Sequence, residues 1–449
     1  MGLRGRGLRI AQIAFIVAPG FTLFGYNQAG LGPLATLHSW AHQFPSLDTV
    51  NTTGPLKSHN SINSGAVIAS FQIGSLIGAL SCIFLGDLLG RRRTIFLAAF
   101  LTLIGQVLQV SAYNLIHVMI PVWLAECSPA AHRGRDVVTA GIFLCFGYSV
   151  CNWVDFAFYH LPSTNLQWRL PLAVVSLPLS LVMMFMVFFL PESPRWLVRV
   201  GRTEEAAKNL SVIKDLSVED DRIRFEIAQI ESSLEFSTEN SASLMQLFSK
   251  DDKERLLYRF CLCIFLQFFQ QMCGGNLISV YASTIFQQNL NLEVSLAKIL
   301  AACALTWKCL CCFVAFIAID RWGRRAVFMI SGAGMSMFRL RVAMSSISTA
   351  NHWLWNFVVV MVTPVALDTI GYRYYVMYTI ISALIPISVY FFYPETMNQN
   401  LETLNNLFRD APSAFKVVSL SLNVPRGELD EESLGKEGHG GVAEQVEKI

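Results

Sequence analysis

The sequence predicts an all-α integral membrane protein. Hydrophobic residues make up 53% of the chain and charged residues only 15%, and the mean hydropathy is +0.46. The charges gather in short blocks, and long stretches with almost none separate them. A soluble chain of 449 residues would carry about a quarter charged residues. One helix needs roughly 20 apolar residues to cross the core of a bilayer, and the stretches between the charged blocks are of this kind.

Apolar stretches of membrane-spanning length recur along the chain. Only helices satisfy their backbone hydrogen bonds within a single lipid-exposed segment, so we expect each stretch to be helical. They lie near Ile10–Leu37, Ser64–Gly86, Thr94–Ala112, Val137–Tyr159, Leu170–Leu190, Phe260–Phe286, Val294–Ile319, Asn351–Leu367 and Tyr374–Tyr393. A signal peptide would also begin with basic residues before an apolar run, but this run reaches Leu37 without a convincing cleavage site. We therefore interpret it as the first spanning helix.

Basic residues predict which loops face the cytoplasm. These loops contain Arg91, Arg92 and Arg93; Arg133 and Arg135; the stretch Arg195–Arg259; and Arg321, Arg324 and Arg325. The loop Ser39–Asn63 has one lysine and the sequon Asn51-Thr52-Thr53, so we expect it outside, with Asn51 as a glycosylation site. The tail beyond Asp410 is polar and acidic and is predicted to be disordered. Both termini would then be cytoplasmic.

The sequence shows no motif typical of an enzyme active site or of a metal site. Most of the 11 cysteines lie inside apolar stretches, without the paired spacing and nearby histidines of a zinc site. No nucleotide loop or nucleophile arrangement stands out. We therefore expect no enzymatic activity, no cofactor, no metal and no nucleic-acid partner.

The chain repeats two motifs in the same order. The segment Asp87–Arg92 (DLLGRR) recurs as Asp320–Arg325 (DRWGRR), and Pro191-Glu192-Ser193 recurs as Pro394-Glu395-Thr396. A single Gly-Arg-Arg loop is common, but two matched pairs are hard to obtain by chance. The repeat predicts two related halves, as many carriers have.

These motifs resemble the sugar-porter branch of the major facilitator superfamily, and the resemblance extends to about Phe408. Glu126 and Arg133, seven positions apart, and the segment Pro191–Arg195 (PESPR) add to it. Its strongest element is Gln270–Asn276 (QQMCGGN), which matches the Gln-Gln-x-x-Gly-x-Asn signature of the seventh helix in that family. The resemblance implies a two-bundle major facilitator fold around a central sugar site that opens alternately to either side. The implied division is an amino-terminal bundle (1–190), a cytoplasmic loop with short helices (191–258), a shortened carboxy-terminal bundle (259–393) and a cytoplasmic tail (394–449).

The resemblance also implies the residues that contact the sugar. Amide side chains donate and accept hydrogen bonds without net charge, which suits a hydroxyl-rich ligand. Such groups are costly in lipid unless they face a cavity or bond to another helix, and helix–helix hydrogen bonding is the alternative explanation. The candidate substrate residues are Gln270, Gln271, Asn276, Tyr281, Asn356 and Lys308. Lys308 stands where an amide is usual; a sugar or anion contact, an ion pair and a snorkelling side chain all remain open.

A second set of charged residues suggests a gate on the cytoplasmic side. The candidates are Asp87, Arg91, Arg92, Glu126, Arg133, Glu192, Arg195, Asp320, Arg324, Arg325 and Glu395. The arginines would pair with the glutamates when the carrier faces outward, and the two aspartates would cap neighbouring helices. Each surface pair contributes about 1 kcal/mol or less, but a network of them can bias a two-state equilibrium.

The chain departs from the family pattern at several positions. Asn27 stands where proton-coupled members carry an aspartate, and an amide cannot release a proton. Gly141 replaces the glutamine of the fifth helix, and Val280 replaces a tyrosine of the seventh.

Of two corresponding intervals, the second is too short for the family fold and the first lacks the pattern of its fourth helix. Asp87 and Pro191 lie 104 positions apart, whereas Asp320 and Pro394 lie only 74 apart. Four crossings already need about 80 residues. The fourth helix and most of the ninth and tenth are missing from the pattern, which leaves about nine to ten spanning helices instead of twelve.

From the sequence alone we expect a multi-pass protein, in the plasma membrane, that transports hexoses or small oligosaccharides by alternating access. The bilayer and the sugar are its expected partners, and facilitated diffusion and proton symport both remain open. The alternatives are a non-transporting sugar sensor of the same fold and an inactive, truncated carrier.

Overall fold

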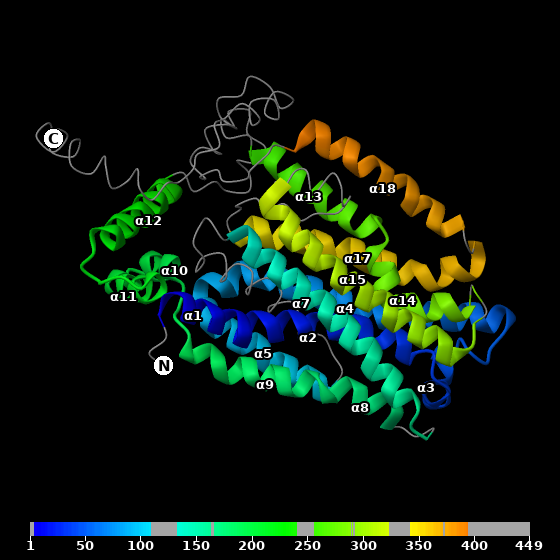
Figure 1. The fold of residues 1–449 in the computed structure, drawn as a ribbon. Helices are drawn as coiled ribbons and strands as arrows, with labels where there is room; N and C mark the ends of the chain where they lie inside the picture. The colour runs from blue at the N-terminus through cyan, green and yellow to red at the C-terminus, as the bar shows by residue number, and fades with distance from the viewer. Residues whose placement is uncertain are drawn as a thin grey trace, which may run out of the picture.

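A computed structural model describes residues 4–108, 133–162, 166–239, 256–288, 290, 292–322, 342–370 and 373–393. Every regular element in these ranges is helical, and the long helices run side by side as a bundle (Figure 1). The predicted all-α membrane class is confirmed. The segments 109–132 and 323–341, where the sequence suggested missing helices, lie outside the described residues, as does the tail 394–449.

The amino-terminal half, residues 4–190, begins with one helix that contains a single π-helical turn. Its elements are α1 (Gly5–Gln12), the π turn Ile13–Val17, α2 (Ala18–Leu34), α3 (His38–Gln43), the 3₁₀ turn Pro45–Leu47, α4 (Gly54–Leu89), α5 (Arg91–Leu108), α7 (Arg133–Tyr159), α8 (Leu166–Val174), α9 (Ser176–Met186) and the 3₁₀ turn Val187–Phe189. The predicted span Leu170–Leu190 is interrupted at Val175, between α8 and α9.

The carboxy-terminal half, residues 256–393, follows three short helices. The short helices are α10 (Pro194–Arg199), α11 (Thr203–Lys214) and α12 (Asp221–Glu239). The helices of the carboxy-terminal half itself are α13 (Leu256–Met272), α14 (Gly275–Gln288), α15 (Val294–Trp322), α17 (Val342–Ile370) and α18 (Arg373–Phe392). The predicted span Phe260–Phe286 is two helices, and Asn351–Leu367 is the inner part of a longer one.

The outer surface of the bundle is apolar. Large side chains such as Phe84 (74% exposed) and Trp307 (68% exposed) point away from the protein. Five of the described helical segments are long and apolar enough to cross a bilayer. Because exposed apolar surface on this scale is stable only in lipid, the chain is an integral membrane protein.

The two ends of the bundle differ in character (Figure 1). At one end, which we call the basic end, Arg91–Arg93 lie beside α10, and the indole of Trp196 donates to the Asp87 carbonyl (3.0 Å). The short helices α10, α11 and α12 pack there around their own apolar cluster. The opposite end, which we call the sequon end, holds α3 and the loop with Asn51. This arrangement is the one that the distribution of basic residues predicts.

The two halves pack closely along three helix pairs: α4 with α17, α7 with α15, and α2 with α14. Gly32 marks the tightest approach, because a Cβ atom there would lie 1.9 Å from the Val280 carbonyl oxygen. Next to this contact, Ile68 of α4 and Val360 of α17 lie in one buried cluster with Val280. The halves are therefore in direct contact near the sequon end.

Candidate functional site

The helix that carries the Gln-Gln-x-x-Gly-x-Asn motif is broken in the middle of the motif. Gly274 has φ +78°, a left-handed conformation that favours glycine, and it separates α13 from α14. Gln271 lies at the end of α13 and Asn276 at the start of α14, so both amides lie at the break. Half-helix ends at membrane depth expose backbone groups, which are tolerated where they face a site inside the protein.

At this break the halves exchange hydrogen bonds through amide and phenol groups. Gln28 of α2 donates to the Asn276 side-chain oxygen (3.1 Å), and the Tyr148 hydroxyl of α7 donates to Gln28 (2.5 Å) and approaches the same Asn276 oxygen (3.4 Å). Asn276 in turn donates to Gln271 (3.0 Å). With His352, which Gln271 contacts, these residues form what we call the central polar network.

The histidine of the network lies beside two amides of α13. His352 Nδ1 lies 3.0 Å from the Gln267 amide oxygen. The Gln271 amide nitrogen lies 2.7 Å from Nε2 and 2.8 Å from Nδ1 of the same ring. His352 therefore links α17 to Gln267 and Gln271 of α13.

Lys308 of α15 lies next to the network. Its ammonium donates to Ser279 of α14 (2.7 Å) and stands 5.1 Å from the centre of the Tyr148 ring. The side chain is half-buried, and within the described ranges no carboxylate forms an ion pair with it. A cation beside neutral amides gives the site both hydroxyl-binding and anion-binding capacity.

The other predicted substrate residues lie apart from the network. Tyr281 is buried and donates to the Val360 carbonyl (3.0 Å). Asn356 is fully buried, its amide nitrogen donates to Gln72 of α4 (2.9 Å), and its oxygen has no hydrogen-bond partner among the described residues. Gln270 is half-buried, and no hydrogen bond from its side chain is described in this part of the chain. The structure thus brings together Gln271, Asn276 and Lys308, and it places Tyr281 and Asn356 at other contacts between helices.

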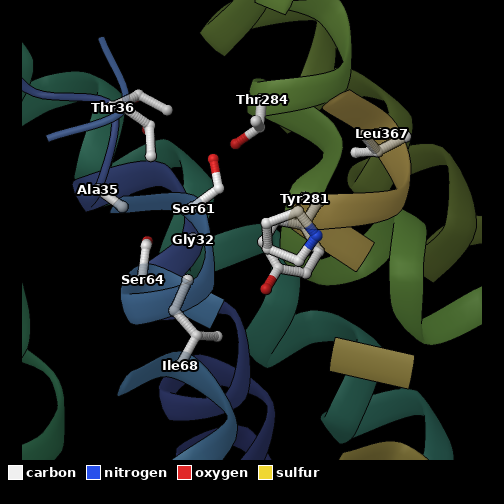
Figure 2. A pocket seen from close by; sticks show the side chains of 11 residues that line it. Gly32, Ala35, Thr36, Ser61, Ser64, Ile68, Tyr281, Thr284 and Leu367 are labelled. Atoms are coloured by element: carbon white, nitrogen blue, oxygen red, sulfur yellow. The ribbon is translucent and has the colours of Figure 1, made fainter. Parts of the chain in front are cut away.

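A small pocket lies between the halves near the sequon end (Figure 2). Its volume is about 30 Å³, which is room for about two water molecules. Ser61 of α4 and Thr284 of α14 point toward one another across it, and Tyr281 lines it from α14 (Figure 2). No sugar ring fits in this space. Because the halves are also in contact beside it, at Gly32 and Val280, we describe the sequon end of the described residues as closed.

The loop at the sequon end is held by Asp48. Its carboxylate accepts from the backbone N–H groups of Val50 and Asn51 (both 2.9 Å) and from the Asn51 side chain (3.1 Å). Burial acts to raise the pKa of Asp48, but these hydrogen bonds and the charge of His38 lower it below its usual value. Asn51 itself is exposed, as a glycosylation acceptor must be.

The charged cluster at the basic end is organised by Glu192. Its carboxylate accepts from the backbone N–H groups of Arg91 (3.2 Å) and Arg92 (3.1 Å), which are the first residues of α5. A carboxylate at a helix amino terminus satisfies unpaired donors and opposes the helix dipole. Asp87, which we expected as a cap, instead pairs with Arg199 (2.5 Å) and Arg91 (3.6 Å).

The remaining gate candidates are only partly covered by the structure. Arg195 lies in α10 at the basic end, Arg133 begins α7, and Asp320 lies in the last turns of α15. The side chains of Arg133 and Asp320 are not described, and Glu126, Arg324, Arg325 and Glu395 lie outside the described residues. The pairs given above join α4, α5 and the segment 191–199, and the pairing of the arginines with Glu126 and Glu395 stays a prediction.

Sequence reasoning missed several residues of this region. Gln28, Tyr148 and His352 complete the central polar network, and Gln72 pairs with Asn356. Gln28 and Gln72 are amides inside apolar stretches, a signal that could have selected them. Tyr148 and His352 carry no such signal, because aromatic and imidazole side chains are common at helix contacts.

With this geometry in place, the chain can be compared with known proteins. The family model described as "Sugar (and other) transporter" matches residues 13–344 and 337–408. The chain belongs to this sugar transporter family. The two matched segments overlap at 337–344, and this overlap begins at the last two residues of the short apolar stretch Ala326–Phe338.

Curated relatives are similar along most of their length. The sugar transporter STL1 of Saccharomyces cerevisiae is 27% identical over 478 positions, covering 91% of this chain and 83% of the relative. The high-affinity glucose transporter ght2 of Schizosaccharomyces pombe is 24% identical, covering 99% of this chain and 96% of the relative.

Solved structures give the fold. The xylose transporter XylE from E. coli, in a form bound to 6-bromo-6-deoxy-D-glucose, aligns with a TM-score of 0.73 at 21% identity, covering 89% of this chain and 99% of that one. A partially occluded inward-open form of XylE gives a TM-score of 0.66 at 20% identity, with 86% of this chain and 99% of that one covered. The sugar transporter therefore has the major facilitator fold.

The alignment with STL1 also shows how many residues this chain lacks relative to STL1. The alignment extends over 478 positions and includes 91% of the 449 residues of this chain, which is about 409 residues. The difference of about 69 positions is present in the relative and has no counterpart here. Three membrane crossings take up about 60 residues. The deficit agrees in size with the helices that the spacing of the repeated motifs marks as missing.

Proposed function

We propose that this chain carries a hexose or small oligosaccharide across a membrane by alternating access, with the central polar network as its substrate site. The observation that supports this most directly is the hydrogen bond between Gln28 and Asn276, which joins the two halves through groups that also suit sugar hydroxyls. A bound sugar would replace these amide–amide bonds with amide–hydroxyl bonds. The halves would then close on the substrate as they close on each other here.

Lys308 determines the substrate range in this proposal. Its ammonium lies beside Tyr148 and Ser279, within reach of a ligand held by Asn276. A neutral sugar would accept a hydrogen bond from it, and a sugar with a carboxylate would gain a charge-assisted one. Gln271 and Gln28 would contact hydroxyl groups on the other face of the ring.

The proposed orientation places the basic end in the cytoplasm and the sequon end outside the cell, in the plasma membrane. Arginines concentrated at one end and a sequon at the other support this assignment. Both termini would be cytoplasmic, and Asn51 would be glycosylated.

A carrier without activity is the second candidate, because about 69 positions of a relative have no counterpart here. Loss of two adjacent helices preserves the sidedness of everything that follows, whereas loss of one inverts it. A sensor that binds sugar without moving it is the third.

Uptake of radiolabelled glucose in a cell that lacks its own hexose transporters separates these functions. We expect saturable uptake by the full chain and a weaker apparent affinity for glucose in Asn276→Ala. Glucose binding to purified protein without uptake would favour the sensor. Absence of both, with the chain correctly inserted, would favour the inactive carrier and contradict the proposal. Restoring the missing segments from the transcript would then be expected to restore uptake.

A further inference from the structure

The resemblance implies that proton-coupled relatives carry a proton-binding aspartate at the position of Asn27. In this chain the side chain there is an amide that hydrogen bonds hold in place. Asn27 donates to the Leu23 carbonyl (2.8 Å) and accepts from Ser176 (3.0 Å) and from Gln106 (3.4 Å). All of its bonds are made within the amino-terminal half, and an amide binds no proton at physiological pH. If protons accompany transport, another group must take them.

A buried carboxyl group lies elsewhere in the same half. Asp155 of α7 is only 3% exposed. One of its oxygens accepts from the Cys151 thiol (3.5 Å), and the other has no hydrogen-bond partner in the part of the chain that the structure describes. An ionised carboxylate in such a buried place costs much free energy, because one thiol donor compensates for only a small part of the lost hydration. The contacts of Asp155 in this structure therefore suit its neutral, protonated form.

A buried lysine faces the same junction from the other half. Lys298 of α15 is 2% exposed, and its ammonium donates to the Pro33 carbonyl (3.0 Å) and to the Thr36 hydroxyl (3.4 Å) at the end of α2. The charges of Lys298 and Asp155 act on each other, yet within the described residues no ion pair joins them. The Lys298 ammonium is thus held by hydrogen bonds to α2. The Asp155 carboxyl group can then be neutralised by a proton.

The surroundings of Asp155 contain few other titratable groups. Cys151 lies one turn away on α7, and Tyr26 faces it from α2, where its hydroxyl donates to the Pro171 carbonyl. Lys298 is the charged group that acts on it from α15. On α8, which also packs on α7, Arg169 stands over the Trp168 ring instead.

Asp155 lies on the same helix as Tyr148 of the central polar network. Asn152, between them in sequence, donates to the Tyr148 carbonyl (3.0 Å). Asp155 lies nearly two turns beyond Tyr148, toward the sequon end, where α7 and α15 must separate for that end to open. Opening would expose Asp155 to the outer solution, and closing would bury it again.

We propose that Asp155 is a proton-binding site, which must be neutralised before the sequon end closes, so that transport by this chain is coupled to protons. This inference rests on the sugar transport proposed above. The carboxylate takes a proton from water while the sequon end is open, and an O–H bond forms on Asp155. After the basic end opens, the proton leaves to water that enters the network, and the carboxylate is restored. Lys298 returns to Pro33 and Thr36 each time the end closes.

The test uses the full chain in liposomes with radiolabelled glucose, measured both as net uptake under an imposed pH gradient and as exchange at equal concentrations. Wild-type net uptake should fall by up to about tenfold per unit of rising outer pH once the proton becomes limiting. Asp155→Asn, which imitates the neutral acid, should retain exchange but lose the pH response and accumulation against a gradient. Asp155→Glu should retain a pH response, and Asp220→Asn, a carboxylate removed at the basic end, should behave as wild type.

Several outcomes would overturn the site. Unchanged accumulation in Asp155→Asn would contradict the proton-binding site. Exchange by the wild type without any pH response would also contradict it, but it would leave the proposed sugar transport intact. Loss of exchange in Asp155→Asn with glucose binding retained would make Asp155 a structural residue. If Asp155→Asn does not fold, Asp155→Glu decides: a displaced pH profile supports the site and an unchanged one contradicts it. Wild type without any exchange would contradict the transport function on which this site depends.

Discussion

Asn276 is the residue through which the two halves exchange hydrogen bonds, and its replacement by alanine removes bonds to Gln28, Tyr148 and Gln271. We predict that Asn276→Ala weakens glucose binding about tenfold or more, since each lost hydrogen bond contributes about 0.5–1.5 kcal/mol and tenfold corresponds to about 1.4 kcal/mol. Glucose affinity measured on purified protein checks this. Asn63→Ala, an amide in the sequon-end part of α4, is the matched control and should bind as wild type. Equal affinity in both variants would contradict the site.

A second residue-scale prediction concerns the pH response of the sequon-end loop. Because the pKa of Asp48 lies below its ordinary value of 3.8, its carboxylate stabilises the loop at higher pH. That stabilisation is lost as the pH falls through the lowered pKa of the folded state. Hydrogen exchange at Val50 and Asn51, corrected for intrinsic rates, should therefore lose protection below about pH 4. Asp48→Asn should be poorly protected throughout, whereas Asp220→Asn, at the basic end, should follow wild type.

The residues of the site were only partly predictable. Gln271 and Asn276 stood out because amides inside apolar helices need a partner, and both have one. Their actual partners could not be foreseen, because Gln28 and Tyr148 reach them only through the packing of α2 and α7 against α14. Lys298 gave the same signal as Lys308 but was passed over, since only Lys308 lay at a position that the resemblance marked.

At the scale of elements, the contact of α2 with α14 depends on Gly32. A Cβ atom would lie 1.9 Å from the Val280 carbonyl, which is backbone and cannot turn aside. We predict that Gly32→Ala disfavours the closed sequon end by about 1–3 kcal/mol, the usual cost of overpacking, and increases the population that is open there. A membrane-impermeant maleimide on Thr284→Cys, in the pocket, should then react faster.

The control for this prediction is Gly141→Ala. A Cβ atom at Gly141 meets nothing within 4 Å, so this substitution should leave the labelling rate unchanged. Equal labelling in Gly32→Ala and Gly141→Ala would show that the close approach does not hold the end shut.

The elements themselves were largely predictable, because apolar stretches of about 20 residues have one stable form in lipid. Their interruptions were less so. The break at Gly274 falls inside a continuous apolar run, and hydropathy does not register a single positive φ. The start of α5 is a similar case. Glu192 caps this helix from about 100 positions further along the chain, and sequence spacing does not reveal such a contact.

For the whole molecule, the contact between α7 and α15 has two levels. Asp155 and Lys298 lie toward the sequon end, whereas Cys145 of α7 and Cys312 of α15 lie about 15–20 Å nearer the basic end along their helices. The two sulfur atoms are 3.4 Å apart and belong to opposite halves. Separation at this second level must accompany opening of the basic end if the halves rotate as bundles.

We therefore predict that iodine, which oxidises two thiols to a disulfide and is itself reduced to iodide, stops glucose transport by joining Cys145 to Cys312. Dithiothreitol should restore transport, and Cys145→Ser should be insensitive to iodine. A protease site placed between α11 and α12 gives the covalent readout, because the two fragments should stay together only before reduction. A cross-linked chain that still transports would mean that α7 and α15 never separate at this level. The access change would then have to come from α4 and α17, the other long pair that joins the halves.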